Sequence, residues 1–97
     1  MKKTLPPLPR SVYFPSGRVK IVRRKGLMEH EKAFGMFHWH KREIVLDAEL
    51  GLEAAWLTLE HEKFHVILMD AGIQLDDYTE ERLCDTVAAA RVAEMLK

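Results

Sequence analysis

The sequence predicts a small α+β domain in which a short β-sheet precedes two long helices. In the first half of the chain, apolar and polar residues alternate over short segments, which is typical of half-buried strands. In the second half, apolar residues recur with helical periodicity over two long runs. A chain of 97 residues is expected to form one domain.

The Pro-rich residues 1–16 are expected to form an N-terminal arm on the domain, which itself spans residues 17–97. Proline has no backbone N–H and favours an extended polyproline conformation, so this segment is not expected to join a helix or a central strand. We expect the arm to lie on the surface of the domain or to be partly disordered. Ser16 and Gly17 then mark a turn.

The predicted sheet is antiparallel and has about three strands, at residues 18–24, 36–40 and 43–47. The first alternates apolar with basic residues, the second follows Gly35, and the third is rich in branched apolar residues. Lys41 and Arg42 form the expected tight turn of a hairpin between the last two. Residues 25–34 show little pattern and predict a loop or a short helix.

Two helices are expected after the sheet, at about residues 52–71 and 79–96. Gly72 is the natural stop of the first helix, because glycine readily adopts the left-handed conformation that ends helices. Asp77 or Thr79 is expected to cap the second helix. A single domain with two antiparallel helices on one small sheet follows from these spans.

The charge is zero overall but differs between the two halves of the chain. Residues 1–45 hold eleven Lys and Arg against three acidic residues, and residues 46–97 hold four against twelve. A basic half can indicate an anionic partner. No nucleic-acid-binding signature accompanies the charge, so we expect a basic sheet beside acidic helices whose fields largely cancel. Nucleic acid is therefore not an expected partner.

The single cysteine and the absence of long apolar runs bear on the cellular setting. Because Cys84 is the only cysteine, a disulfide framework is excluded, and we expect a reducing, cytoplasmic location. We expect Cys84 to be a small buried helix residue rather than a nucleophile. No apolar run approaches the roughly 18 to 20 residues needed to span a bilayer, so no membrane partner is expected.

The segment His61-Glu62-Lys63-Phe64-His65 reads H-E-x-x-H and lies within the first predicted helix. Residues four apart lie on the same face of a helix, so His61 and His65 can direct two imidazoles at one metal ion. Glu62 is then close enough to reach a water on that ion. Two His ligands and a Glu that acts as general base predict a catalytic Zn²⁺ site.

A catalytic zinc needs a third protein ligand beside an open position for water. No His follows His65, so the third ligand is either a downstream carboxylate or an upstream His. Glu80 and Glu81 start the second helix, which an antiparallel pairing would bring near His65. Glu81 and Asp85 share a face, so Glu81 can bind the metal while Asp85 accepts the free N–H of a ligating His.

The sequence resembles the gluzincin metallopeptidases in two segments, Thr58-Leu59-Glu60-His61-Glu62-Lys63-Phe64-His65 and Glu81-Arg82-Leu83-Cys84-Asp85. In that family an H-E-x-x-H helix precedes a helix with E-x-x-A-D, and Cys84 stands where Ala is usual. The likeness covers roughly residues 18–96 and is closest to minigluzincins and to ImmA/IrrE-like metallopeptidases of phages and mobile elements. It implies a zincin-like fold and a zinc endopeptidase acting on a peptide or protein. The implied ligands are His61, His65 and Glu81, with Glu62 as general base, Asp85 behind a ligand, and Glu80 as the rival to Glu81.

Five further residues are candidates for contacts with the substrate or the oxyanion. His38 and His40 share one face of a strand and are expected to be packed or solvated unless one reaches the cleft. Tyr13 and Tyr78 could donate to the oxyanion, although each is expected to pack an apolar ring. An extended substrate is expected to add as a strand beside the third predicted strand, at Val45.

Two other functions remain compatible with the sequence. In the first, the protein is a catalytically idle, zinc-containing binding module. In the second, the basic N-terminal half recognises nucleic acid or an acidic protein, and the zinc fold is its scaffold. Loss of proteolysis with retention of zinc in Glu62→Ala would argue against the first, and salt-dependent binding to DNA or RNA would favour the second.

Overall fold

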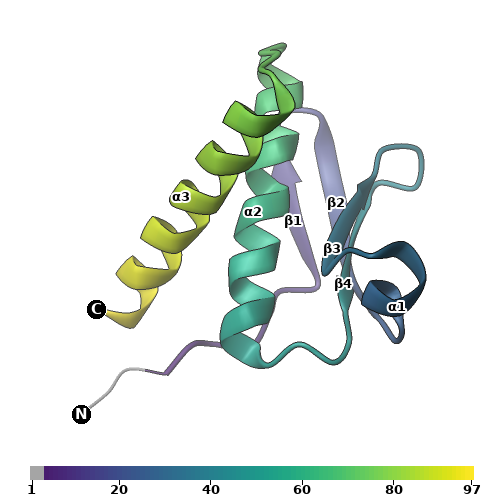
Figure 1. Cartoon of the computed structure of the whole chain (residues 1–97), viewed down its shortest axis with the longest axis vertical. Coiled ribbons are helices and arrows are strands. Elements are labelled where there is room, and N and C mark those ends of the chain that lie inside the picture. Colours follow the sequence, from purple (N-terminus) through teal and green to yellow (C-terminus); the bar gives the residue numbers. More distant parts are fainter. Residues whose placement is uncertain (1–3) are drawn as a thin grey trace.

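A computed structural model describes residues 4–97 as a four-stranded mixed sheet with two long helices on one side (Figure 1). In chain order the elements are β1 (Ser11–Phe14), β2 (Gly17–Arg24), α1 (Leu27–Glu31), β3 (Gly35–His38), β4 (Glu43–Asp47), α2 (Leu52–Ala71) and α3 (Asp77–Leu96). The predicted α+β class is confirmed. Within residues 4–97, no helix is both long and apolar enough to cross a membrane.

The sheet has the strand order β1-β2-β4-β3, which corrects the prediction of a three-stranded antiparallel sheet. The β1–β2 and β3–β4 pairs are antiparallel, but β2 and β4 run parallel. β4 is therefore a central strand between β2 and β3. All five of its residues are buried, including Glu43 and Asp47, because both of its edges and both of its faces are covered.

The additional strand, β1, lies inside the predicted Pro-rich arm. Its residues Val12 and Phe14 pack against the core, and its neighbour across the hairpin is β2. The chain before β1 lies against α2, where the indole Nε1 of Trp56 donates a hydrogen bond to the carbonyl oxygen of Pro6 over 2.8 Å. Leu5 and Leu8 also pack against the core.

The two long helices form an antiparallel pair, and α2 lies between the sheet and α3 (Figure 1). α2 has the predicted bounds and ends at Gly72, whose φ of 69° is left-handed as predicted. α3 starts two residues earlier than predicted. Asp76, not Asp77 or Thr79, is its N-cap, because the Asp76 carboxylate accepts a hydrogen bond from the backbone N–H of Thr79 over 3.0 Å.

The core fixes α2 against the sheet and thereby sets which of its faces is free. On the sheet side, the buried residues are Val19, Ile44 and Leu46, and the helices contribute Trp56, Leu59, Val66 and Val92. A buried carboxylate, Glu60, is held by ion pairs with Lys63 and Arg91. Burial of a charge in a core requires such partners, so this network also fixes α3 on α2.

Candidate metal centre

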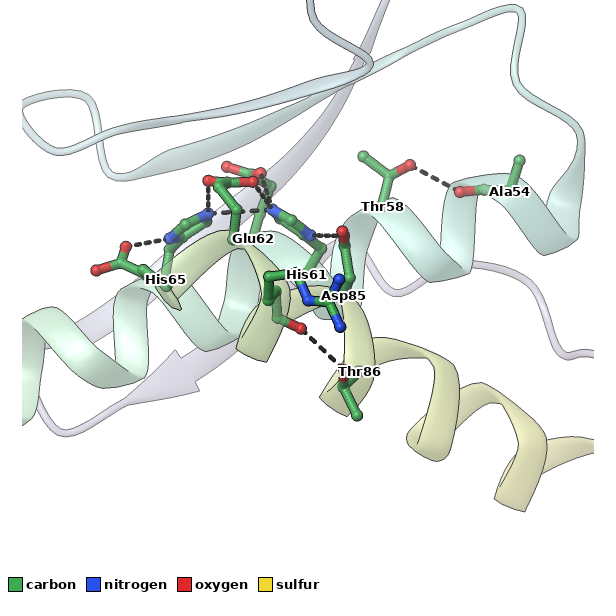
Figure 2. Close-up of polar contacts among 10 residues, drawn as sticks. Ala54, Thr58, His61, Glu62, His65, Asp85 and Thr86 are labelled. Atoms are coloured by element: carbon green, nitrogen blue, oxygen red, sulfur yellow. Dashed lines mark hydrogen bonds and ion pairs between the residues drawn. The ribbon is translucent and has the colours of Figure 1, made fainter. Parts of the chain in front are cut away.

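The H-E-x-x-H segment lies in the middle of α2, on the side that faces α3 and a surface cleft. His61 and His65 are one helical turn apart, and their Nε2 atoms approach to 3.1 Å. The two rings meet edge to face, with centroids 4.8 Å apart and ring planes 66° apart. Figure 2 shows both side chains on the same side of the helix. The helical spacing predicted from the sequence therefore brings both ring nitrogens to one point.

The first turns of α3 bring three carboxylates to these two imidazoles. Glu81 bridges them, with one carboxylate oxygen 3.0 Å from Nε2 of His61 and the other 3.0 Å from Nε2 of His65. Asp85 lies 2.7 Å from Nδ1 of His61, on the outer side of that ring (Figure 2). Glu80 lies 2.5 Å from Nδ1 of His65.

The hydrogen-bonding capacity of this cluster indicates that it suits a cation. A neutral imidazole whose Nδ1–H donates to a carboxylate presents a lone pair at Nε2. If Asp85 and Glu80 accept hydrogen bonds from the two Nδ1–H groups, each Nε2 carries a lone pair and no hydrogen. The two Nε2 lone pairs and the Glu81 carboxylate oxygens then point at one another with no hydrogen atom between them, an arrangement that a cation would stabilise. Nitrogen atoms bound to one tetrahedral zinc at about 2.0–2.1 Å lie about 3.4 Å apart, close to the 3.1 Å observed.

Glu62 lies beside the two histidines without contacting either closely. Its nearer carboxylate oxygen is 4.0 Å from Nε2 of His61, and its side chain is only 13% exposed. Burial raises the pKa of Glu62, while the nearby His65 and His61 oppose that shift. Glu62 is thus a partly desolvated carboxyl group placed to exchange a proton at the centre of the cluster.

Cys84 lies beneath the cluster, fully buried on α3 as the sequence predicted. Its sulfur and one nitrogen each of His61 and His65 lie within 4.8 Å of one another, so these three residues form a possible metal-binding group. Burial, together with Glu80 and Glu81, raises the pKa of the thiol to about 12. Beside the two histidines, the geometry therefore offers two candidates for a third ligand, the Cys84 sulfur and the Glu81 carboxylate.

Two clefts meet at the cluster. The larger, of about 670 Å³, extends past Gly35 and Thr58, and the smaller, of about 590 Å³, extends past Phe37 and Ile73. Glu62 and His65 line both. A ligand crossing from one cleft to the other would therefore pass the candidate metal centre.

The placement of Val45 contradicts its predicted contact with substrate. Val45 is 0% exposed and lies in β4, paired on one side with Val22 and on the other with Met36. A central strand has no free backbone groups for an added peptide. In this part of the sheet the free edge belongs to β3.

The other candidate contacts lie away from both clefts. His38, at the end of β3, lines a third cavity on the opposite face of the sheet, and His40 is exposed in the following turn. Tyr78 and Tyr13 are exposed rather than packed, at 72% and 77%. Tyr78 accepts a hydrogen bond from Arg82 over 3.5 Å. No upstream His lines either cleft, so a carboxylate is the remaining type of third ligand apart from Cys84.

Gly35 was not predicted as part of the site, although it lines the larger cleft. A Cβ atom at this position would lie 2.5 Å from Cγ2 of Thr58 and 3.4 Å from Cγ of Glu62. The glycine therefore lets β3 approach α2 directly beside the candidate base. Its signal in the sequence was a glycine at the start of a predicted strand, where close backbone approach is one of the usual reasons.

Comparison of the chain with protein-family models, with curated proteins and with solved structures gives no match. Its functional interpretation therefore rests on the geometry of the cluster and on the sequence motif.

Proposed function

We propose that the protein is a zinc-dependent metallopeptidase with His61, His65 and Glu81 as ligands. One observation carries the proposal: two Nε2 atoms 3.1 Å apart share the Glu81 carboxylate at 3.0 Å each. Nitrogen and carboxylate oxygen are both usual zinc ligands, and three protein ligands with an open cleft is the usual form of a catalytic site. The sequence resemblance to gluzincins supports the same ligand set.

The residues around the ligands support this assignment. Asp85 and Glu80 each hold the Nδ1 side of one imidazole, which fixes the tautomer and ring orientation in which Nε2 is free to bind. Glu80 thus has a different role from Glu81, the residue beside it. Such carboxylate–histidine pairs also raise the basicity of the ligand nitrogen.

Zinc, when bound, supplies Lewis-acid chemistry: it acidifies water and polarises a carbonyl group. The remaining proton chemistry belongs to Glu62. Its carboxylate accepts the proton that the attacking water loses, and then delivers that proton to the leaving amine. Glu62 suits both steps, because it is partly desolvated and lines both clefts.

A peptide substrate fits along β3 rather than β4. β3 is an edge strand, and its residues Gly35 and Phe37 each line one of the two clefts. An extended peptide that pairs with this edge by backbone hydrogen bonds would cross from one cleft to the other. Its scissile bond would then pass beside Glu62.

Three single substitutions test the proposal. Glu62→Gln should keep one zinc per chain but lower cleavage of a fluorescent, unfolded casein by about 10²–10⁴-fold, the usual contribution of a general base. Glu81→Gln should lose zinc, because the amide is a much poorer ligand. Glu94→Gln, at the far end of the same helix, is the matched control and should change neither metal content nor cleavage.

Two results would contradict the proposal. Zinc retained in Glu81→Gln but lost in Cys84→Ala would replace the carboxylate with the thiol in the ligand set. A zinc-loaded wild-type protein that cleaves neither casein nor any member of a mixed peptide library would identify a binding module instead of an enzyme.

A further inference from the structure

Basic side chains of β2 and the acidic residues of the two long helices lie on opposite sides of the sheet. Val19 and Ile21 of β2 face the helices. Neighbouring residues of a strand point to opposite faces, so Arg18, Lys20 and Arg24 point away from the helices. Most acidic residues of the second half lie in α2 and α3, beyond the other face. The positive charges of these β2 side chains are therefore not neutralised by direct pairing with the acidic residues of the helices. This differs from the expectation drawn from composition.

The two acidic side chains that β4 directs to the outer face, Glu43 and Asp47, already have partners. Glu43 is 8% exposed and pairs with Arg24 over 3.7 Å. Asp47 is 5% exposed and accepts hydrogen bonds from the backbone N–H groups of Met28 and Glu49. Neither carboxylate is available to the exposed cations. Within residues 4–97, Arg18 and Lys20 have no carboxylate partner.

An exposed aromatic ring and a cavity lie on the same face. Tyr13 of β1 is 77% exposed and is the cross-strand partner of Arg18, so the two side chains share the outer face. Further along the same face is a cavity of about 370 Å³, whose charged lining residues are Arg24, Lys25, Lys41 and one carboxylate, Glu31. We call this surface the basic face, defined by Tyr13, Arg18, Lys20, Lys25 and Lys41.

We propose that the basic face binds single-stranded nucleic acid. Its cations would contact backbone phosphates, and the ring of Tyr13 would stack on an unpaired base, which is the usual combination in proteins that bind single strands. An acidic peptide would also use the cations, but an unpaired base offers the flat partner on which an exposed ring stacks. A duplex keeps its bases stacked on each other and out of reach of Tyr13. This surface is separate from the proposed zinc site and does not depend on it.

Fluorescence anisotropy with a labelled oligothymidine of about 12 nucleotides, a length within the site sizes of known single-strand binders, tests the proposal. Removing two cations with Arg18→Ala and Lys20→Ala together should weaken affinity roughly tenfold. It should also reduce the slope of log affinity against log salt by about 1.4, or about 0.7 per phosphate contact. Tyr13→Ala should weaken affinity roughly tenfold through lost stacking but leave the salt slope unchanged.

The matched control removes two positive charges from the helix layer, with Arg82→Ala and Lys97→Ala together, and should leave the affinity unchanged. All variants should keep the wild-type circular dichroism spectrum and zinc content, so the outcome is independent of the metallopeptidase proposal. Three results would overturn the inference: no binding by the wild type at low salt, equal weakening in the control, or full affinity in Tyr13→Ala. Equally tight binding of a duplex of the same length would also overturn it.

Discussion

At the scale of single residues, the close contact between β3 and α2 depends on Gly35, because glycine has no side chain. The space that a Cβ atom would occupy is taken by the methyl group of Thr58 at 2.5 Å, and Glu62 lies just beyond it at 3.4 Å. The hydroxyl of Thr58 donates to the carbonyl oxygen of Ala54 and so holds its side chain in one orientation. Gly35 thus helps to position Glu62, the candidate base, by allowing β3 to approach α2 closely.

Gly35→Ala should lower the free energy of unfolding by about 1–3 kcal/mol, the usual cost of overpacking a closely packed site. Adding Thr58→Ser removes the clashing methyl group but keeps the hydroxyl, so the double variant should recover most of this loss. Denaturant unfolding of the two single variants and the double variant measures the coupling. Strict additivity of the two changes would contradict the direct contact.

The different positions of Glu80 and Glu81, at Nδ1 of His65 and at the two Nε2 atoms respectively, show how far residue-level prediction reaches. H-E-x-x-H predicts the convergence of its own side chains, because they belong to one helix. Neighbouring residues of a helix point about 100° apart, so the orientation of α3 decides which glutamate meets Nε2. That orientation is set by the burial of Cys84, Ala88 and Val92 against α2, which depends on packing between two elements.

At the scale of elements, the start of α3 depends on Asp76. Hydrogen bonding by the side chain and the backbone N–H of Thr79 lowers the pKa of Asp76 below its ordinary value of 3.8. The ionised carboxylate also interacts favourably with the positive end of the helix. Because Glu80 and Glu81 follow within the first two turns, this cap orders the segment that approaches the two histidines.

Asp76→Ala should lower the melting temperature at neutral pH. The folded-state pKa is depressed, so the stabilisation by Asp76 is fully present above about pH 4 and is lost as pH falls through the folded-state pKa. The difference in melting temperature between wild type and variant should therefore shrink below about pH 4. Thermal unfolding across this pH range checks it, and a difference that is constant with pH would rule out a role for the ionised cap.

The helices were easier to predict than the sheet, for a physical reason. Helical periodicity is local, and α2 has the predicted bounds. The four residues of β1 fall between prolines and gain their strand conformation only by pairing with β2. Every residue of β4 is buried, which is typical of a central strand. In the sequence, the continuous apolar run Ile44-Val45-Leu46 already indicated such a strand. The parallel partner of β4 lies about twenty residues away and cannot be recognised from local pattern.

At the scale of the whole molecule, the proposed zinc site joins two layers that share a modest core. A chain of this length buries a limited apolar area, so a bound ion contributes appreciably to stability. Glu81 belongs to α3, whereas His61 and His65 belong to α2. A metal held by all three would therefore connect the outer helix to the helix that contacts the sheet.

Zinc should raise the melting temperature, and a chelator should reverse the effect. At free zinc about 100-fold above Kd, linkage gives about 2.7 kcal/mol, which corresponds to roughly 10–20 °C in a domain of this size. Differential scanning fluorimetry with zinc or chelator measures the shift. Glu81→Gln should show almost none, and an equal shift with magnesium in the wild type would contradict a nitrogen-containing site.

The strand order also constrains the sequence of events in folding. β4 follows β2 and β3 in the chain but lies between them in the sheet, so the sheet cannot assemble strand by strand during synthesis. The two hairpins, β1–β2 and β3–β4, can form locally and quickly. Their parallel junction closes a much longer loop and is expected to form more slowly. The sheet surface that supports α2 is complete only after that junction, so we expect His61 and His65 to reach their final positions late in folding.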